Sequence, residues 1–204
     1  MYKSNYNWFI NSNINNDLDK YLDKNNKRDI LEIGCFEGLS SVFFADNFID
    51  NDSSTLTLVD PFSTIADNDH TKYNLLEAEK NFDYNLSICK NKNKIDIQKI
   101  TSDKFFENNK KKFDFIYIDG SHECEQIKKD MDNAYKILNE KGIMWMDDYL
   151  GGDQGNTDIK DTMDSWIQSH NCKIIFQGYQ IAIVGKLTSK YLLNKNGNRR
   201  TFTI

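Results

Sequence analysis

Short apolar runs alternate with amphipathic stretches along most of this chain. The apolar runs, typical of buried strands, cover residues 30–33, 56–59, 95–100, 113–118, 143–146, 173–177 and 180–186. Apolar side chains at helical spacing between these runs predict helices at about 39–48, 71–90, 102–108 and 157–169. The stretch after the fourth run is also predicted to be helical, because Ile127, Met131, Ala134 and Leu138 fall on one face. Gly142 is expected to break that helix near its end.

This order of elements predicts an α/β fold. Five strands that alternate with helices imply a doubly wound, mostly parallel sheet. The last two runs flank Gly178 and Tyr179 and are predicted to form a C-terminal antiparallel hairpin, which completes a seven-stranded sheet. We therefore expect the domain to span residues 30–186.

The two ends of the chain have weaker patterns. Residues 1–29 are polar and rich in asparagine, and we expect an N-terminal cap segment with a short helix at about 17–24. Trp8 and Phe9 either cover the mouth of a site or pack on the sheet, and packing on the sheet is the favoured prediction. Residues 187–204 are predicted to be a C-terminal tail.

Composition narrows the classes of partner. The 204 residues carry a net charge of −5 without a long basic block, which argues against nucleic acid and membrane surfaces as partners. The sequence lacks both an apolar stretch of about 18 residues and the apolar centre of a signal peptide. Four scattered cysteines without a CxxC pair favour reduced thiols in a cytoplasmic protein over a zinc site.

Acidic residues follow two of the predicted strands. The run at 113–118 ends in Asp119, and the run at 143–146 ends in Asp147 and Asp148. A strand–helix–strand crossover places both strand ends on one sheet edge, where ligands of α/β sheets bind. Three crowded carboxylates repel one another unless they are neutralised, and oxygen ligands suit Mg²⁺. We therefore predict a magnesium site, although Asp119 as a helix cap beside a solvated loop is the alternative.

His122 lies three residues after Asp119 in the same predicted loop. Its imidazole titrates near neutral pH and can reach a substrate hydroxyl without displacing Asp119. We predict that His122 is a general base. The alternative is a capping or surface histidine.

A glycine loop joins the first predicted strand to its helix. Gly34 and Gly38 allow a sharp turn and close approach to a ligand. A dinucleotide fingerprint would need glycine where this chain has Phe36 and Leu39, which argues against a nicotinamide cofactor. Asp60, after the second strand, can accept hydrogen bonds from ribose hydroxyls or can simply form a turn.

Two motifs resemble the class I S-adenosylmethionine-dependent methyltransferases. The pattern ExGxxxGxS, from Glu32 to Ser40, resembles the first motif of catechol O-methyltransferase-like enzymes. The segment FDFIYIDGSH, followed by a helix and then GIMWMDDY, is closer to the sugar O-methyltransferases of the macrocin and mycinamicin type. The resemblance covers about residues 30–186 and implies a Rossmann-like methyltransferase fold.

The resemblance also implies residue roles. Asp119, Asp147 and Asp148 match the magnesium ligands, and His122 matches the general base of the sugar enzymes. The catechol enzymes usually have Asn at the last ligand position, and the mycinamicin enzyme has Glu at the middle one. The implied cofactor-binding residues are Glu32, Gly34, Gly38, Asp60, Ser102, Asp103 and Asp119, with Ser102 and Asp103 near the adenine.

The predicted function is Mg²⁺-dependent transfer of a methyl group from S-adenosylmethionine to a hydroxyl of a small acceptor, a sugar or glycoside. The enzyme alternative is a catechol or phenol O-methyltransferase, which His122 disfavours. A non-catalytic methyltransferase-like binding module and a nicotinamide-dependent sugar oxidoreductase are further alternatives. A homo-oligomer remains compatible with the sequence.

Overall fold

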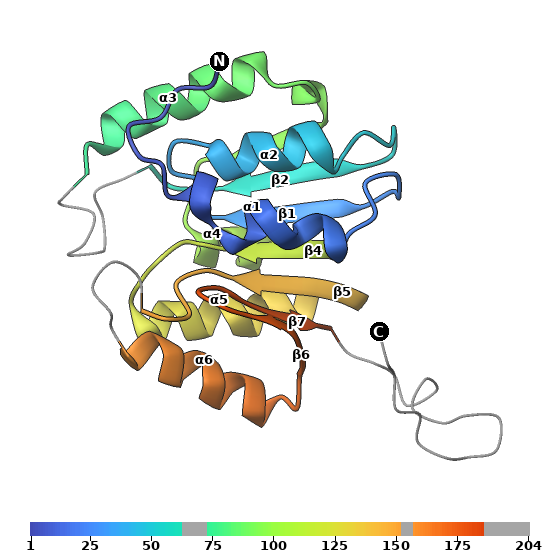
Figure 1. The fold of residues 1–204 in the computed structure, drawn as a ribbon, viewed down its shortest axis with the longest axis vertical. Helices are drawn as coiled ribbons and strands as arrows, with labels where there is room; N and C mark the ends of the chain where they lie inside the picture. The colour runs from blue at the N-terminus through green and yellow to red at the C-terminus, as the bar shows by residue number, and fades with distance from the viewer. Residues whose placement is uncertain (63–72, 152–156, 186–204) are drawn as a thin grey trace.

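A seven-stranded sheet runs through the middle of the molecule (Figure 1). The computed structural model describes residues 1–62, 73–151 and 157–185. The strands are β1 (Asp29–Ile33), β2 (Thr55–Val59), β3 (Ile95–Gln98), β4 (Phe113–Ile118), β5 (Leu138–Met146), β6 (Lys173–Gln177) and β7 (Ile181–Val184). Their order is β3-β2-β1-β4-β5-β7-β6; β1 to β5 pair in parallel, and β7 is antiparallel to both its neighbours. The predicted doubly wound sheet with a terminal hairpin is confirmed.

Helices cover both faces of this sheet (Figure 1). One face carries α1 (Asn13–Asp17), α2 (Leu39–Asn47) and α3 (Leu75–Ile88), and the other carries α4 (Ser102–Asn108), α5 (Cys124–Ile137) and α6 (Thr157–Ser169). Short 3₁₀ turns lie at η1 (Phe9–Asn11), η2 (Leu18–Lys20) and η4 (Lys92–Lys94).

Alternate side chains of each strand enter different cores. On β4, Phe115 and Tyr117 pack with α2, whereas Ile116 and Ile118 pack towards α5. Strands buried on both faces need nearly continuous apolar sequence, which explains why their runs were visible in the sequence.

The first helix begins earlier than the sequence predicts. α1 starts at Asn13 because the Ser12 side chain accepts a hydrogen bond from the backbone N–H of Asn15. The helical segment then ends with η2 at Lys20. The expected helix at 17–24 is therefore wrong in its bounds, although Leu18 is buried as its pattern suggested.

The boundary between α5 and β5 also differs from the prediction. Leu138 does not end the helix but begins β5, and Gly142 lies inside that strand. A Cβ atom on Gly142 would lie 2.9 Å from Leu138 Cδ1 and 3.0 Å from the carbonyl oxygen of Asp114. Gly142 is thus required by close packing at an irregular strand pair rather than by a helix end.

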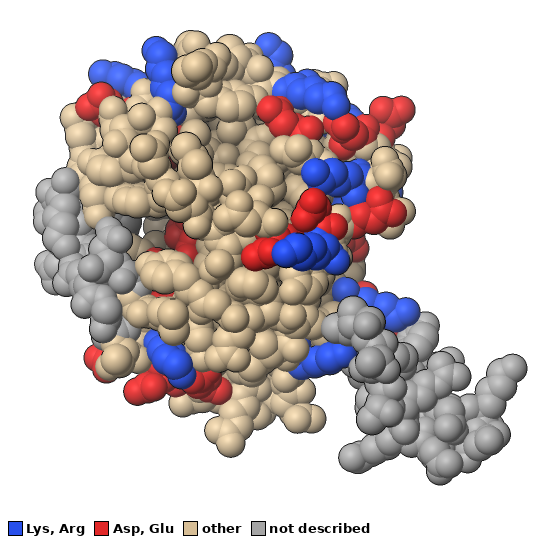
Figure 2. Space-filling view, viewed as in Figure 1, with Lys and Arg blue, Asp and Glu red and all other residues tan. Residues whose placement is uncertain are grey.

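Four further predictions concern the C-terminal tail, membrane-spanning helices, the surface charge and the cysteines. The predicted tail at 187–204 lies outside the described residues. Within the described ranges, no helix is both long and apolar enough to cross a membrane. Lysine, arginine and acidic side chains are interspersed on the face seen in Figure 2. The four cysteines are free thiols.

Candidate functional site

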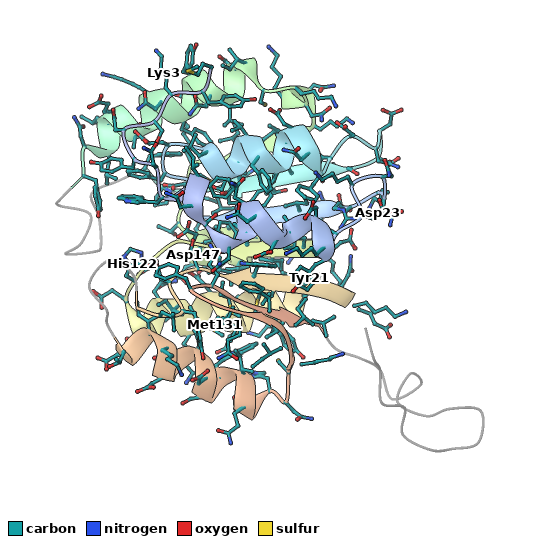
Figure 3. All side chains as sticks on the ribbon, viewed as in Figure 1. Lys3, Tyr21, Asp23, His122, Met131 and Asp147 are labelled. Carbon is teal, nitrogen blue, oxygen red and sulfur yellow. The ribbon has the colours of Figure 1, made fainter. Side chains whose placement is uncertain are left out.

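The candidate site lies where β1, β4 and β5 end side by side. Ile33 is in register with Ile118, and Ile118 with Met146, so the residues that follow them meet at one edge. The backbone N–H of Asp119 donates to Ile33 O at 2.8 Å, and that of Asp147 donates to Ile118 O at 2.9 Å. Figure 3 shows His122 and Asp147 at the same end of the sheet.

A buried tyrosine joins the two strand-end carboxylates. The hydroxyl of Tyr117 lies 2.5 Å from Asp147 Oδ2 and 3.1 Å from Asp119 Oδ2. Gln180 of the hairpin donates to the Tyr117 hydroxyl at 3.3 Å and accepts from Trp145 Nε1 at 3.0 Å. The sequence did not reveal Tyr117 or Gln180 as site residues. The usable signal for Tyr117 was its place two residues before Asp119, because such residues share a strand face.

Burial and the close approach of the three carboxylates raise the pKa values of Asp119 and Asp147. Burial and the neighbouring charges of Asp147 and Asp148 hold the pKa of Asp119 well above its usual range. Burial and Asp148 also raise the pKa of Asp147 to about 6. A cation at this position would relieve the repulsion between these carboxylates.

His122 is paired with the third carboxylate. Its Nε2 lies 2.8 Å from Asp148 Oδ2, and the Tyr179 hydroxyl donates to Asp148 Oδ1 at 2.9 Å. The backbone of Asp148 is left-handed, with φ of +53°, and its N–H donates to Asp147 Oδ1 at 2.8 Å. Asp148 therefore orients the imidazole and is itself held by the hairpin.

The four residues expected to converge do lie together, but they do not form a preassembled metal centre. Asp119, His122, Asp147 and Asp148 line one cavity. In the part of the chain that the structure describes, no group of three His, Cys, Asp or Glu side chains is arranged to hold a metal ion. The donor chemistry suits a hard cation, and both Asp148 oxygens already have partners.

The glycine loop is shaped by the chain that crosses it. Gly34 has φ of +84°, and a Cβ atom there would lie 1.8 Å from the carbonyl oxygen of Asp119. Gly38 has φ of +79° and begins α2 beside Phe82. Glycine at both positions thus lets the loop after β1 pass against the loop after β4 and against α3.

Glu32 stabilises the junction between this loop and α2. Its carboxylate is fully buried and accepts hydrogen bonds from the hydroxyls of Ser40 and Ser41. Burial raises the pKa of Glu32 to about 8, although the serine hydroxyls oppose that shift. Glu32 lies outside the walls of the two cavities described below, so its geometry favours bracing of the loop over direct ligand contact.

Asp60 also braces the loop. Its Oδ2 accepts from the backbone N–H groups of Cys35 at 2.8 Å and Phe36 at 3.0 Å, and its Oδ1 accepts from Phe62 N–H at 2.8 Å. Oδ2 already accepts two hydrogen bonds, whereas Oδ1 accepts one and can accept a further one. Asp60 is thus compatible with both of its predicted roles, the turn and the ribose contact.

Two cavities meet at this strand edge. The larger, of about 510 Å³, is lined by Asp60, Ser102 and Asp103. The smaller, of about 430 Å³, is lined by Tyr117, His122, Asp147 and Asp148. Both cavities are lined by Gly34, Phe36, Asp119 and Gly120, which form a shared wall. Asp60, Ser102 and Asp103 lie on one side of this wall, and His122 lies on the other.

The N-terminal segment forms part of the smaller cavity. Trp8 is 47% exposed and contacts the rings of Tyr6, Phe36 and Tyr73, with centroids 4.5, 5.4 and 5.2 Å away. The expectation that Trp8 packs on the sheet is therefore wrong. Phe9 lines the cavity as well, but it packs against Phe43 of α2.

A buried glutamate, which could not be recognised from the sequence pattern, holds this segment in place. Glu37 is 2% exposed and accepts from the Ser4 hydroxyl and from the backbone N–H of Asn5 at 2.8 Å. Asn81 of α3 donates to the other oxygen at 2.8 Å. The N-terminal segment is therefore joined to the glycine loop and to α3.

A family model described as "Methyltransferase domain" matches residues 31–149, which is more than half of the chain and includes both glycine positions and all three strand-end aspartates. The chain belongs to this methyltransferase family. The expected class I S-adenosylmethionine-dependent methyltransferase family is thereby confirmed. A search of curated proteins finds no match.

Solved structures share the fold of this methyltransferase at low sequence identity. A Staphylococcus aureus protein, provisionally described as a caffeoyl-CoA O-methyltransferase, is 21% identical, with 85% of this chain and 83% of that chain covered and a TM-score of 0.60. A Clostridium thermocellum protein, provisionally described as an rRNA methylase, is 13% identical, with 84% and 93% covered and a TM-score of 0.63. TomG from Streptomyces achromogenes, an O-methyltransferase solved with SAM, is 14% identical, with 78% and 74% covered and a TM-score of 0.55.

These neighbours differ in their described acceptors, and at such identities they show the fold alone. The acceptor of the present methyltransferase must therefore be argued from its own site.

Proposed function

We propose that this methyltransferase transfers the methyl group of S-adenosylmethionine to a hydroxyl of a small acceptor. The observation that carries the proposal is the pair of cavities that share Gly34, Phe36, Asp119 and Gly120. A donor in one cavity and an acceptor in the other can meet at this wall. Such alignment is the main requirement, since the sulfonium methyl is already activated and the enzyme needs chiefly to orient the reactants.

The larger cavity is the proposed cofactor site. Asp60 would accept from the ribose hydroxyls there, while Ser102 and Asp103 line the end assigned to adenine. Gly34 and Gly38 allow the loop to lie close to the ligand, and Glu32 would act indirectly by holding Ser40 and Ser41. Asp119, in the shared wall, would lie near the transferred methyl.

The smaller cavity is the proposed acceptor site, with His122 as general base. Asp148 holds the imidazole at 2.8 Å, and Tyr179 holds Asp148. Asp148 faces Nε2, which favours the tautomer with the proton on Nε2 and a lone pair on Nδ1, the form that a general base needs to take a proton from an acceptor hydroxyl. The proton then rests on the imidazole beside a carboxylate, which stabilises its charge.

We also propose that Asp119, Asp147 and Asp148 hold Mg²⁺. The support is their hard oxygen donors together with the burial and mutual repulsion that raise the pKa values of Asp119 and Asp147. Asp148 would have to turn one oxygen away from His122 or Tyr179. When bound, the cation would stabilise negative charge on an acceptor oxygen.

The acceptor class follows from the two walls of the smaller cavity. Acidic groups and His122 line one part, whereas Tyr6, Trp8 and Phe36 present aromatic rings in another. A sugar or glycoside has hydroxyls for the first and an apolar ring face for the second. A catechol-type phenol is the second candidate, because the same aromatic rings would stack on a planar acceptor.

The proposal is tested by binding and turnover. Calorimetry with S-adenosylhomocysteine should show binding that Asp60→Ala weakens by about 10- to 100-fold, as expected for a lost hydrogen-bonding group. Asp96→Ala, at an exposed position on β3, is the matched control. Methyl-labelled cofactor should then label a panel of methyl glycosides or catechols. A protein that binds no S-adenosylhomocysteine, or labels neither class of hydroxyl, would contradict the proposal.

A further inference from the structure

A buried aspartate on α5 has no role in the chemistry proposed above. Asp130 is 2% exposed and lies on the helix face that carries Ile127, Met131 and Ala134 into the core. Burial of a carboxylate is costly, and an apolar residue would suit this face better. Burial raises the pKa of Asp130 to about 6. A stability role alone therefore does not explain an acidic residue here.

Asp130 belongs to a polar cluster at one end of the larger cavity. Gln126 Nε2 lies 3.1 Å from Asp130 Oδ1, 3.2 Å from Asp103 Oδ1 and 3.3 Å from Ser102 Oγ. The Ser102 hydroxyl is also hydrogen-bonded to the Asp130 carboxylate, which has about four acceptor sites and so is not saturated by these two donors. All four residues line the cavity. The cluster therefore has acceptor capacity left for a ligand.

The chemistry of this end matches one edge of adenine. Adenine presents an exocyclic amino group, a donor, beside ring nitrogens that accept. A carboxylate only accepts, and an amide nitrogen only donates. Asp130 Oδ2 also points towards the end of β4, since it lies 4.0 Å from the position of a Cβ on Gly120.

We propose that Asp130, supported by Gln126, accepts a hydrogen bond from the 6-amino group of the cofactor's adenine and so selects adenine over 6-oxopurines. The inference rests on the proposed function, because it requires an adenosyl ligand in the larger cavity. It adds a specificity-determining residue on α5 to Ser102 and Asp103, the first residues of α4.

The test compares two ligands that differ at this group. S-inosylhomocysteine carries an oxygen where S-adenosylhomocysteine carries the amino group, and that oxygen would face the carboxylate. We expect calorimetry to give about 10- to 100-fold tighter binding of the adenosyl ligand by the wild-type protein. Asp130→Asn should bring the ratio close to one, because an amide can accept from an amino group or donate to an oxo group.

Asp132→Asn is the matched control, since Asp132 lies on the same helix but accepts from Trp166 Nε1 of α6 at 2.7 Å. It should keep the wild-type ratio. Equal binding of the two ligands by the wild type, or a wild-type ratio in Asp130→Asn, would overturn the inference and leave the proposed function standing. If Asp130→Asn fails to fold, equal binding of the two ligands by the wild type still overturns the inference, and Gln126→Ala, which removes the residue that supports Asp130, should lower the ratio. If the wild-type protein binds neither ligand, the proposed function fails as well.

Discussion

At the scale of single residues, His122 carries the clearest chemical prediction. Its ring is held by Asp148 on one side of a cavity that Asp119 and Asp147 also line. The sequence placed His122 near the strand end, but the orientation of its ring depends on Asp148 and Tyr179.

His122→Ala should lower kcat by about 10²- to 10⁴-fold, the usual contribution of a positioned base. The pH profile of kcat should lose the limb that reports the base. Calorimetric affinity for S-adenosylhomocysteine should stay within a few-fold of wild type, because His122 lines only the acceptor cavity. The matched control is His170→Ala, since His170 packs on Trp166 of α6. A variant with near-normal kcat would show that His122 is structural and would remove the main argument for a sugar over a phenol.

Glu32 gives a prediction about stability. Burial, together with the nearby charge of Asp60, raises its pKa to about 8 in the folded protein, above the usual range of a glutamate. Between pH 4.5, the usual pKa of a glutamate, and about pH 8, the folded state holds a proton that the unfolded state releases. The free energy of unfolding therefore falls as the pH rises through this range. Glu32→Gln mimics the protonated form and should reduce the loss between pH 5 and pH 8 by about 2–4 kcal/mol.

Denaturant unfolding at several pH values measures this effect as the difference between variant and wild type, which removes contributions from Asp119 and Asp147. Asp83→Asn, on the exposed side of α3, serves as the control. Parallel curves for wild type and Glu32→Gln would show that Glu32 is already ionised in the folded protein at pH 5.

At the scale of elements, the loop after β1 and the loop after β4 form one unit. Gly34→Ala should destabilise the protein by more than about 2 kcal/mol, because the left-handed φ is unfavourable and the new Cβ would overlap the Asp119 carbonyl. The expected fall in Tm is at least about 4–8 °C for a chain of this length.

Gly120→Ala, in the loop after β4, is the variant to compare with Gly34→Ala. A Cβ there would make ordinary contacts, at 3.4 Å from Ile33 Cγ2 and 3.9 Å from its carbonyl oxygen. Its Tm should fall much less. Equal Tm values for the two variants would mean that the loops are not packed against each other as described.

At the scale of the whole molecule, the strand-end carboxylates link metal binding to global stability. A ligand that binds only the folded state at about ten times its Kd contributes about 1.4 kcal/mol. We therefore expect saturating Mg²⁺ to raise Tm by about 3–6 °C. Excess chelator should reverse the rise, and turnover should stop with it.

Asp147→Asn should abolish the Mg²⁺-dependent rise in Tm, because it removes a charge from the proposed metal site. Asp96→Asn should retain it, since Asp96 is exposed on β3, which β2, β1 and β4 separate from β5. Full turnover in excess chelator would refute the magnesium requirement while leaving methyl transfer itself untouched.

The pattern of apolar runs and the strand-end residues were enough to predict the fold class and the neighbourhood of the site. Strands buried on both faces require continuous apolar runs, and residues that follow parallel strands share one edge, so Asp119 and Asp147 could be placed together from the pattern alone. Gly34 was recognisable because few other residues adopt its conformation.

The contacts between distant segments become visible only in the folded chain. In the sequence Tyr117 and Gln180 are only members of predicted strands, and their polar atoms gain a role only where Gln180 Nε2 meets the Tyr117 hydroxyl. Likewise Trp8 reaches the cavity because buried Glu37 holds the N-terminal segment. Local periodicity reports which face of an element is buried, but it cannot report which partner a side chain meets, because that partner is chosen by packing across the whole chain.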